Sequence, residues 1–381
     1  MSQVHKEAVK AQLAVGVSDL RGALTKLKRA IRGSGSSDYV VQHIEFSSTN
    51  LHGDVALVTN DTEKGTRVRL NAEVDHFGDS FLIRLDQLES VLEGERGKVE
   101  FIVRGEEVEV RVGGIDYTLS ILDQEFNQLP LGENMTKLGT LDKERFVELV
   151  YMAEDFTFTS QRLKPNARKS LQGIFFNKGK AIMTQGYYMI LDEVGELVED
   201  VLMDGGPNLK RVRPTIKNLP GDVVTVWTDD EWVMISGSDH ENEVFLQQID
   251  ADFPEYEAVV PEHNDLKLQV DVEQLYHFVN KASKIAGVDS SEEVVLTIQQ
   301  GAESVNLTHR DPEVGEMATE ITSNYPTYDF KYSFKAEFMA NILENVKEHK
   351  DEVSIWFSDK ETAMLIEGRS GRKYVQMPIK D

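Results

Sequence analysis

The sequence predicts an α+β protein built from three similar domains, and two observations carry this prediction. Three short β-rich segments, residues 99–103, 224–228 and 353–357, can be laid over one another, and each is followed by a polar turn and another β-rich run. Each third of the chain also opens with an amphipathic helix and later carries a second helix. A repeat this long far exceeds a solenoid unit and indicates separate domains in a row. We place the domains at residues 1–130, 138–260 and 265–381.

The helix that opens each domain shows a cap and an apolar stripe. Ser18 or Asp19 is the expected cap in domain 1, because its side chain can accept hydrogen bonds from the first turn. Asp142 and Asp271 stand at the matching places in domains 2 and 3, and Gln274 occupies the capping-box position of the third helix. Apolar residues then recur at intervals of three and four, so each helix presents one face to a core.

Second helices are expected over residues 85–92, 214–219 and 335–347. Pro214 is placed at the start of its helix, because proline fits a first turn and disrupts a helix interior. Alternating runs such as residues 108–112 predict strands between the helices. Polar, turn-forming residues predict linkers at 127–139 and 261–266. Each domain is therefore expected to lay its helices on antiparallel sheet.

The composition is typical of a folded cytoplasmic protein. Its 381 residues, 40% of them hydrophobic and 28% charged, suit two or three domains. Residues 1–16 lack an apolar export signal, and no run approaches the roughly 18 apolar residues of a membrane span. Cysteine is absent, so disulfides and thiolate metal sites are excluded. We expect cytoplasmic localisation and no membrane partner.

The charge of the chain is strongly negative but unevenly distributed. The net charge of −25, from 66 acidic and 41 basic side chains, argues by itself against nucleic acid as a partner. A single basic run is usually a solvated helix face. Recurrence of basic residues near the predicted helices of an acidic protein instead favours a functional basic surface. Its residues are Lys26, Lys28, Arg29, Arg32, Arg162, Lys164, Arg168, Lys169, Lys210, Arg211, Arg213, Lys217, Lys281 and Lys284.

Motifs that carry catalysis are not found in the sequence. There is no GxxxxGK[ST] loop, dinucleotide fingerprint, HExxH or GxSxG motif. The 9 histidines show no metal-ligand spacing. Asp250 and Asp252 resemble the start of a calcium loop, but Phe253 and Pro254 interrupt it. We therefore expect no catalytic residue, no metal and no cofactor.

Several motifs resemble the bacterial DNA polymerase III β sliding-clamp family, as do the three-domain layout, the length and the acidity. The most specific is the run 374–380, Tyr-Val-Gln-Met-Pro-Ile-Lys, which is similar to the family's closing Tyr-Val-x-Met-Pro. Three further motifs resemble segments of the family's second and third domains. They are residues 249–256 with Pro261, residues 311–316 leading to 320–321, and residues 171–173 with 184–187.

The chain departs from the family pattern in three places. A Gly/Ser segment at 33–37 replaces the Arg-Pro-rich segment that usually follows the first helix. Gln185 and Tyr188 stand where the family's Thr-Asp-Gly-x-Arg-Leu motif has an acid and a base. Asn127 follows Phe126 where Phe-Pro is usual. Divergence of this kind would suit a clamp encoded by a phage or a plasmid.

The resemblance implies a non-enzymatic processivity factor. Members of the family dimerise head to tail into a closed ring of six similar domains, with helices inside and sheets outside, and the ring encircles duplex DNA. On this pattern the basic surface would face the hole, with Lys210 and Lys217 as the strongest candidates for phosphate contacts. Weak, sequence-independent contacts suffice, because such a ring holds DNA by topology.

The resemblance also implies protein partners: a DNA polymerase, a clamp loader and other proteins with a clamp-binding motif. Their peptides dock in an apolar cleft between domains 2 and 3. Carried over by motif, the cleft residues are Leu171, Thr184, Gly186, Tyr187, Tyr188, Met189, Pro261, Val375, Met377, Pro378 and Ile379. Leu171 and Val375 could equally be core residues. Closure of the homodimer would pair Tyr117 and Leu119 of domain 1 with Ile285 of domain 3.

Two other functions stay open on the sequence. An acidic α+β hydrolase would use a carboxylate pair that no motif reveals, and its concave site would hold mutually perturbed Asp or Glu residues. A multidomain scaffold that binds only proteins would tolerate charge reversal at Lys210 and Lys217.

Overall fold

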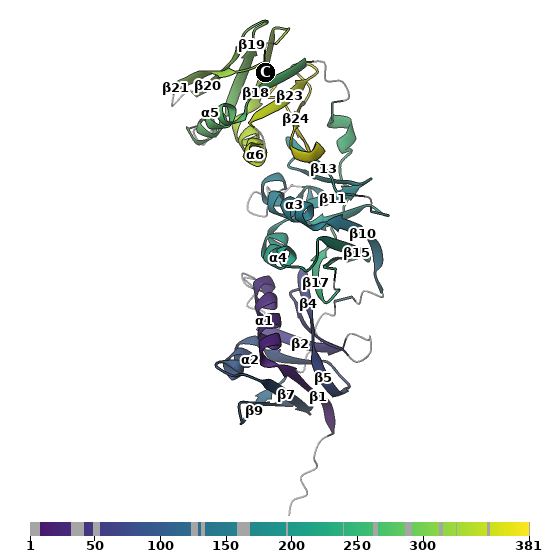
Figure 1. The fold of residues 1–381 in the computed structure, drawn as a ribbon. Coiled ribbons are helices and arrows are strands. Elements are labelled where there is room, and N and C mark those ends of the chain that lie inside the picture. The colour runs from purple at the N-terminus through teal and green to yellow at the C-terminus, as the bar shows by residue number, and fades with distance from the viewer. Residues whose placement is uncertain are drawn as a thin grey trace, which may run out of the picture. The chain divides into compact units, whose positions relative to one another are not determined.

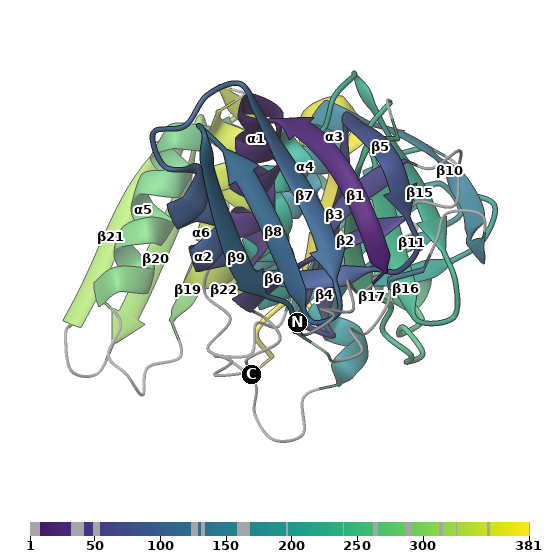
Figure 2. The same ribbon diagram turned by 90° about the horizontal axis from the view of Figure 1, so that it is seen from below.

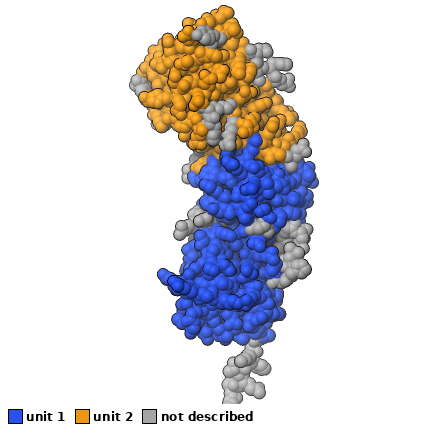
Figure 3. All heavy atoms as spheres, in the orientation of Figure 1, with its two compact units in different colours: residues 1–151, 196–249 blue, residues 152–195, 250–381 orange. Residues whose placement is uncertain are grey.

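The computed structural model describes residues 8–31, 42–48, 54–122, 129–130, 134–157, 168–195, 197–238, 240–261, 266–285, 292–311, 315–324, 326–348 and 351–380. These residues form six α-helices and four antiparallel sheets, which confirms the predicted α+β class (Figure 1). The chain divides into two compact units (Figure 3). Unit 1 comprises residues 1–151 and 196–249, and unit 2 comprises residues 152–195 and 250–381. The boundaries of the three predicted domains stay a prediction.

The elements recur three times in the same order. Repeat 1 contains β1 (Val9–Gly16), α1 (Val17–Ile31), β2 (His43–Ser48), β3 (Val55–Asn60), β4 (Lys64–Leu70), β5 (Ala72–Phe77), β6 (Phe81–Arg84), α2 (Leu85–Leu92), β7 (Lys98–Arg104), β8 (Glu107–Val112) and β9 (Ile115–Ser120). Repeat 2 contains β10 (Thr136–Asp142), α3 (Lys143–Phe156), β11 (Gly173–Asn177), β12 (Lys180–Thr184), β13 (Tyr188–Glu193), β14 (Val201–Asp204), α4 (Pro207–Lys217), β15 (Val223–Thr228), β16 (Trp232–Ser236) and β17 (Asn242–Gln247). Repeat 3 contains β18 (Leu266–Asp271), α5 (Val272–Ile285), β19 (Glu293–Ile298), β20 (Ser304–Asp311), β21 (Gly315–Thr322), β22 (Phe330–Lys335), α6 (Ala336–Lys347), β23 (Glu352–Phe357), β24 (Met364–Glu367) and β25 (Lys373–Gln376).

Strand pairing within each repeat follows one rule. The first strand pairs antiparallel with the strand after the second helix, so β1 pairs with β7, β10 with β15 and β18 with β23. The three segments aligned in the sequence lie in β7, β15 and β23, so their equivalence is confirmed. Repeat 1 adds β5 on the other side of β1, and Figure 2 shows β5, β1, β7, β8 and β9 side by side.

Neighbouring repeats join by sharing a sheet. In unit 1 the strand order is β10-β15-β16-β17-β4-β3-β2-β6, so β17 of repeat 2 pairs with β4 of repeat 1. In unit 2, β25 of repeat 3 pairs with β13 of repeat 2. The same backbone bond ends both pairings: Gln247 donates to the Glu63 carbonyl (3.1 Å) and Met377 to the Tyr187 carbonyl (2.9 Å). We call these two pairings the unit 1 joint and the unit 2 joint.

Each joint encloses an ion pair. In the unit 1 joint, Arg67 Nη1 lies 2.8 Å from Glu243 Oε2; burial raises the pKa of Glu243, and the charge of Arg67 opposes that rise. In the unit 2 joint, Nε and Nη2 of Arg372 lie 3.1 and 2.8 Å from Asp192 Oδ2. The side chains of Arg372 and Asp192 are 5% and 0% exposed, so this pair is sealed from water.

Two of the predicted helix caps are confirmed. Asp142 Oδ1 accepts a hydrogen bond from the Arg145 amide (2.8 Å), and Asp271 Oδ1 accepts one from the Gln274 amide (2.7 Å). The capping-box role of Gln274 is wrong, because its Oε1 accepts from the amide of Thr322 instead (3.2 Å).

Three other local predictions are wrong. Helix α1 begins at Val17, so Ser18 and Asp19 lie in its first turn and Gly16 precedes it. Helix α4 begins seven residues before Pro214, which lies in the helix interior; Pro207 already occupies the first position. The linker prediction fails at its end, because β10 begins at Thr136 inside the segment 127–139.

Candidate nucleic-acid interface and peptide cleft

Helix α4 is the most basic helix that the structure describes. It contains Lys210, Arg211, Arg213 and Lys217 and, alone among the α-helices that the structure describes, no Asp or Glu. Its apolar face, including Leu209, is buried in unit 1. Lys210 and Lys217 are exposed, and a spacing of seven residues places them on the same side of the helix. The helix therefore presents positive charge to solvent along one face.

The start of α4 is tied to a turn of repeat 1. Asp204 accepts hydrogen bonds from the Gly206 amide (3.0 Å) and from Asn208 Nδ2 (2.9 Å), and Asn208 Nδ2 also donates to Glu63 (3.1 Å). Beside this turn Lys64 is buried and forms an ion pair with Asp61. Burial lowers the pKa of Lys64 to about 8. These polar contacts fix where the basic helix begins.

Two of the predicted cations lie on helix α1, and both have protein partners on other elements. Lys26 Nζ donates to Asn242 Oδ1 (2.8 Å), and Lys28 Nζ lies 2.5 Å from Glu89 Oε1 on the acidic helix α2. The side chain of Arg29, and all of Arg32, lie outside the described residues. Helix α1 contacts α4, so Lys26 and Lys28 lie on the same helical layer of unit 1 as the α4 cations.

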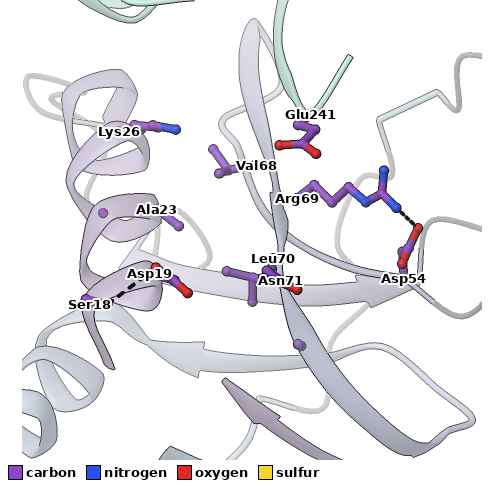
Figure 4. A pocket seen from close by; sticks show the side chains of 12 residues that line it. Ser18, Asp19, Ala23, Lys26, Asp54, Val68, Arg69, Leu70, Asn71 and Glu241 are labelled. Carbon is purple, nitrogen blue, oxygen red and sulfur yellow. Dashed lines mark hydrogen bonds and ion pairs between the residues drawn. The ribbon is translucent and has the colours of Figure 1, made fainter. Parts of the chain in front are cut away.

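A polar pocket of about 610 Å³ opens beside α1 in unit 1 (Figure 4). Lys26 of α1 lies on one side, and Arg69 of β4, ion-paired with Asp54, lies opposite. Glu241 and Asp19 add two more carboxylates to the lining. The acidic and basic side chains of this pocket offset one another, so it lacks the charge excess of α4.

The remaining predicted cations fall in unit 2 or outside the described chain. Arg168 and Lys169 are exposed where a short 3-10 helix begins (η4, Lys169–Gln172). Lys281 and Lys284 are exposed on α5. Arg162 and Lys164 lie outside the described residues.

The residues predicted for the peptide cleft gather around the unit 2 joint. Thr184 Oγ1 accepts from the Gly186 amide (2.9 Å) and donates to the Tyr188 carbonyl (2.8 Å), which closes a tight turn between β12 and β13. Gly186 has φ +88°, a conformation that favours glycine. Leu171 lies on the side where another residue at this position would carry its Cβ. The turn places Tyr187 at the surface with a side chain 64% exposed.

The C-terminal residues complete this region. Met189 is paired with Val375 across β13 and β25, and both are buried in an apolar cluster that Met377 packs against. Met377, Pro378 and Ile379 themselves are half-buried, as is Pro261. Met189 and Val375 thus form the buried part on one face of the sheet, and Met377, Pro378, Ile379 and Tyr187 form the accessible part. Tyr188 precedes Met189 in β13, so its side chain lies on the other face.

Phe338 was not predicted from the sequence but belongs to this region. Its ring stacks on Tyr188 (4.6 Å between centroids) and on Tyr187 (6.0 Å). The Tyr188 hydroxyl donates to the Asp155 carbonyl and accepts from Asn341 Nδ2 (3.2 Å), which holds the stack in place. Phe338 lies on α6, far from the motif in sequence, so only its place on the amphipathic helix hinted at burial.

Of the three residues predicted for the dimer interface, Tyr117 and Leu119 belong to unit 1 and Ile285 belongs to unit 2. Tyr117 and Leu119 are half-exposed on β9, at the edge of the sheet that contains β1. Ile285 ends α5 and is 42% exposed.

No helix that the structure describes is long and apolar enough to cross a membrane. Within the described ranges no group of three or more His, Asp or Glu side chains could hold a metal ion.

Comparisons with known proteins agree on one fold. The family model for the C-terminal domain of the DNA polymerase III beta subunit matches residues 257–380. No curated protein matches the chain by sequence. The structure is similar to the DNA polymerase sliding clamp from Bacillus subtilis, with a TM-score of 0.77 and 15% identity over 98% of this chain and 100% of that one.

Two further solved structures extend this similarity. DNA polymerase III beta subunit from Thermotoga maritima has a TM-score of 0.72 and 20% identity over 97% of this chain and 100% of that chain. The sliding clamp from Bartonella birtlesii, solved with griselimycin, has a TM-score of 0.74 and 16% identity over the same shares. Neither the hydrolase nor the protein-only scaffold gains support. Residues 257–380 therefore belong to the family formed by the C-terminal domains of DNA polymerase III beta proteins, and the chain as a whole has the sliding-clamp fold.

Proposed function

We propose that this protein is a DNA sliding clamp, a ring of two chains that encircles duplex DNA and tethers a replicative polymerase. The pairing at its two joints carries this proposal. In each joint the last strand of one repeat pairs with a strand of the preceding repeat, β17 with β4 and β25 with β13. The partner is in both cases the third strand after the first helix of its repeat. Among the described strands, the corresponding members left at sheet edges are β9 and β21. A second chain joined head to tail by the same pairing would unite β21 with β9 twice and close six repeats.

The registers identify what would be buried at this contact between chains. Through β7 and β8, Tyr117 of β9 is the counterpart of Val244 in β17 and of Tyr374 in β25. Both counterparts are 0% exposed inside their joints. Tyr117 is half-exposed, so its burial against the second chain would extend the same rule. Leu119 and Ile285 complete the proposed interface.

The charge distribution supports duplex DNA as the molecule that the ring encircles. Lys210 and Lys217 on α4 would meet phosphates without reading sequence, together with the exposed cations Arg168, Lys169, Lys281 and Lys284. The net charge of −25 would repel DNA from the other surfaces. The proposed role is cytoplasmic and non-enzymatic, and it needs no cofactor: the protein lends processivity to a polymerase that a clamp loader helps to place.

Electron microscopy of the purified full-length protein tests the ring. In negative stain at micromolar concentration we expect class averages of a six-lobed ring with a hole wide enough for duplex DNA. Compact or elongated particles without a hole would overturn the clamp proposal.

The cleft around the unit 2 joint is proposed as the docking site for polymerase, loader and other clamp-binding peptides. Replacing Met377 and Pro378 together with alanine is expected to weaken binding of a bacterial polymerase's clamp-binding peptide at least about tenfold, because buried anchor contacts dominate such interfaces. Fluorescence anisotropy with labelled peptide measures this loss. Val198→Ala, which trims an apolar side chain that is 74% exposed in unit 1, is the control. Undiminished affinity of the double variant would rule out this cleft, and electron microscopy would verify that its ring persists.

A further inference from the structure

The ion pair of the unit 1 joint occupies a position that also exists in the proposed contact between chains. Arg67 and Glu243 are direct partners across β4 and β17, and their side chains form an ion pair (2.8 Å). Side chains alternate between the two faces of a strand, so both lie on the face opposite the core that contains Val68 and Leu70. The registers identify which residues take these two places on β9 and β21.

Asp116 on β9 takes the place of Glu243. Tyr117 is the counterpart of Val244, so Asp116 is the counterpart of Glu243, one residue earlier on each strand. Asp116 is exposed in the single chain. A carboxylate is therefore present at this position of the edge strand, as it is in the unit 1 joint.

Ala318 on β21 takes the place of Arg67. The last residue before the second helix is Arg84 in repeat 1 and Lys335 in repeat 3. Counting from these residues across the paired strands β6-β2-β3-β4 and β22-β19-β20-β21 leads to Arg67 and to Ala318. The contact between chains would thus set the Asp116 carboxylate opposite a methyl group, where the unit 1 joint has a guanidinium.

Two further carboxylates flank this position. Glu316 and Glu320 lie two residues to either side of Ala318, so they share its face of β21, and both are exposed. Diagonal neighbours on antiparallel strands lie about 7–8 Å apart, so Asp116 would approach both of them. Like charges at this distance repel each other across the strand pair.

Two arginines contact these carboxylates within the single chain. Arg310 forms an ion pair with Glu316 (3.3 Å). Arg111 lies 3.9 Å from Asp116 but only 2.7 Å from Glu109. Among the described residues on this side of the two sheets, the carboxylates outnumber the guanidinium groups that contact them, so both edges carry net negative charge.

The other face of the same contact is apolar. Tyr117 would face Met317, because their counterparts Val244 and Thr66 are direct partners in the unit 1 joint. Both Tyr117 and Met317 are partly exposed in the single chain. Their mutual burial would hold two chains together, while the charges on the opposite face would push them apart.

We propose that the two chains associate through a contact that is apolar on one face and negatively charged on the other, so that salt strengthens the ring. The inference rests on the proposed clamp function and deepens it. Dissolved ions screen the repulsion between exposed carboxylates and leave the apolar burial in place. An interface held by ion pairs would respond to salt in the opposite direction.

The salt dependence of dimerisation tests this proposal. Sedimentation of fluorescently labelled full-length protein, at nanomolar to micromolar concentration, measures the dissociation constant of the dimer. Between about 50 mM and about 500 mM NaCl the Debye length falls roughly threefold, and we expect the dissociation constant to decrease at least about threefold. An increase with salt would overturn the inference while the ring stands. Protein that stays monomeric at every salt concentration would overturn both.

Ala318→Arg places a cation at the position that Arg67 holds in the unit 1 joint. At low salt we expect this variant to lower the dissociation constant about two- to thirtyfold, because the ring would gain two exposed ion pairs. Val198→Arg adds the same charge at a position that is 74% exposed and lies on neither edge strand, so it should have little effect. Equal effects of the two variants would mean that net charge alone governs assembly, and the proposal would fail.

A double-mutant cycle tests whether Asp116 and Ala318 face each other. In a protein that also carries Asp116→Asn, most of the gain from Ala318→Arg should disappear. A gain of undiminished size would show that the arginine acts on Glu316 and Glu320 of its own strand, and it would refute the proposed register.

Discussion

Reversing the charge of Lys210 and Lys217 to glutamate is expected to lower the affinity of the assembled protein for duplex DNA at least about tenfold. Both side chains are exposed on one face of a helix without acidic residues, so the change replaces two attractions with two repulsions. Each phosphate contact releases counterions, so loss of two contacts should also flatten the slope of log affinity against log salt by about 2. Anisotropy titrations at several salt concentrations measure both quantities.

The control for this variant changes the same net charge elsewhere. Lys98 and Lys331 are exposed on strands β7 and β22, and their reversal to glutamate adds the same negative charge away from α4. We expect the control to leave the salt slope unchanged. Equal losses in both proteins would mean that total charge alone governs binding, and unchanged affinity of the α4 variant would favour the protein-only scaffold.

Asp192→Ala is expected to be the most destabilising of the substitutions considered. The carboxylate is fully buried and accepts two hydrogen bonds from Arg372, so its removal takes both of these bonds from a buried guanidinium in the unit 2 joint. Breaking one side of such a pair costs about 3–5 kcal/mol in the free energy of unfolding. Urea denaturation followed by circular dichroism would show this loss as a lower transition midpoint.

The ion pair of Arg69 and Asp54 provides the comparison for Asp192. It is partly exposed, with side chains 44% and 31% accessible, so Asp54→Ala should cost at most about 1 kcal/mol. Replacing Asp192 with leucine and Arg372 with methionine together should recover much of the loss, because no charge then stays buried. A cost below about 1 kcal/mol for Asp192→Ala would show that water or neighbouring groups replace the carboxylate.

Local features of the fold were predictable from sequence because they depend on neighbouring residues. Asp142 and Asp271 cap their helices as expected, since an N-cap is set by a side chain and the amide three residues later. Helix α4 shows the limit of this reasoning. Two prolines could each begin a helix, and Pro214 lies in the interior because packing of residues such as Leu209 extends the helix backward.

The candidate site was predictable only where it follows a continuous motif. The turn at Gly186 and the C-terminal run around Met377 are adjacent in the structure because β13 pairs with β25, a register that no local pattern reveals. Phe338 was missed for the same reason. Its importance comes from the rings of Tyr187 and Tyr188, which lie on other elements, and on the sequence it is one aromatic residue of an amphipathic helix.

Because neighbouring repeats share sheets, the boundaries of the sequence repeats and the boundaries of the compact units fall at different residues. Repeat 2 contributes β17 to unit 1 and β13 to unit 2, so it is divided between the two compact units. A fragment cut at the repeat boundaries would bare a strand edge and half of an ion pair at each end. Duplication of a whole repeat and folding of a compact unit would therefore involve different stretches of the chain. A deletion made at the repeat boundaries would disrupt a compact unit, and a deletion made at the unit boundaries would remove part of a repeat.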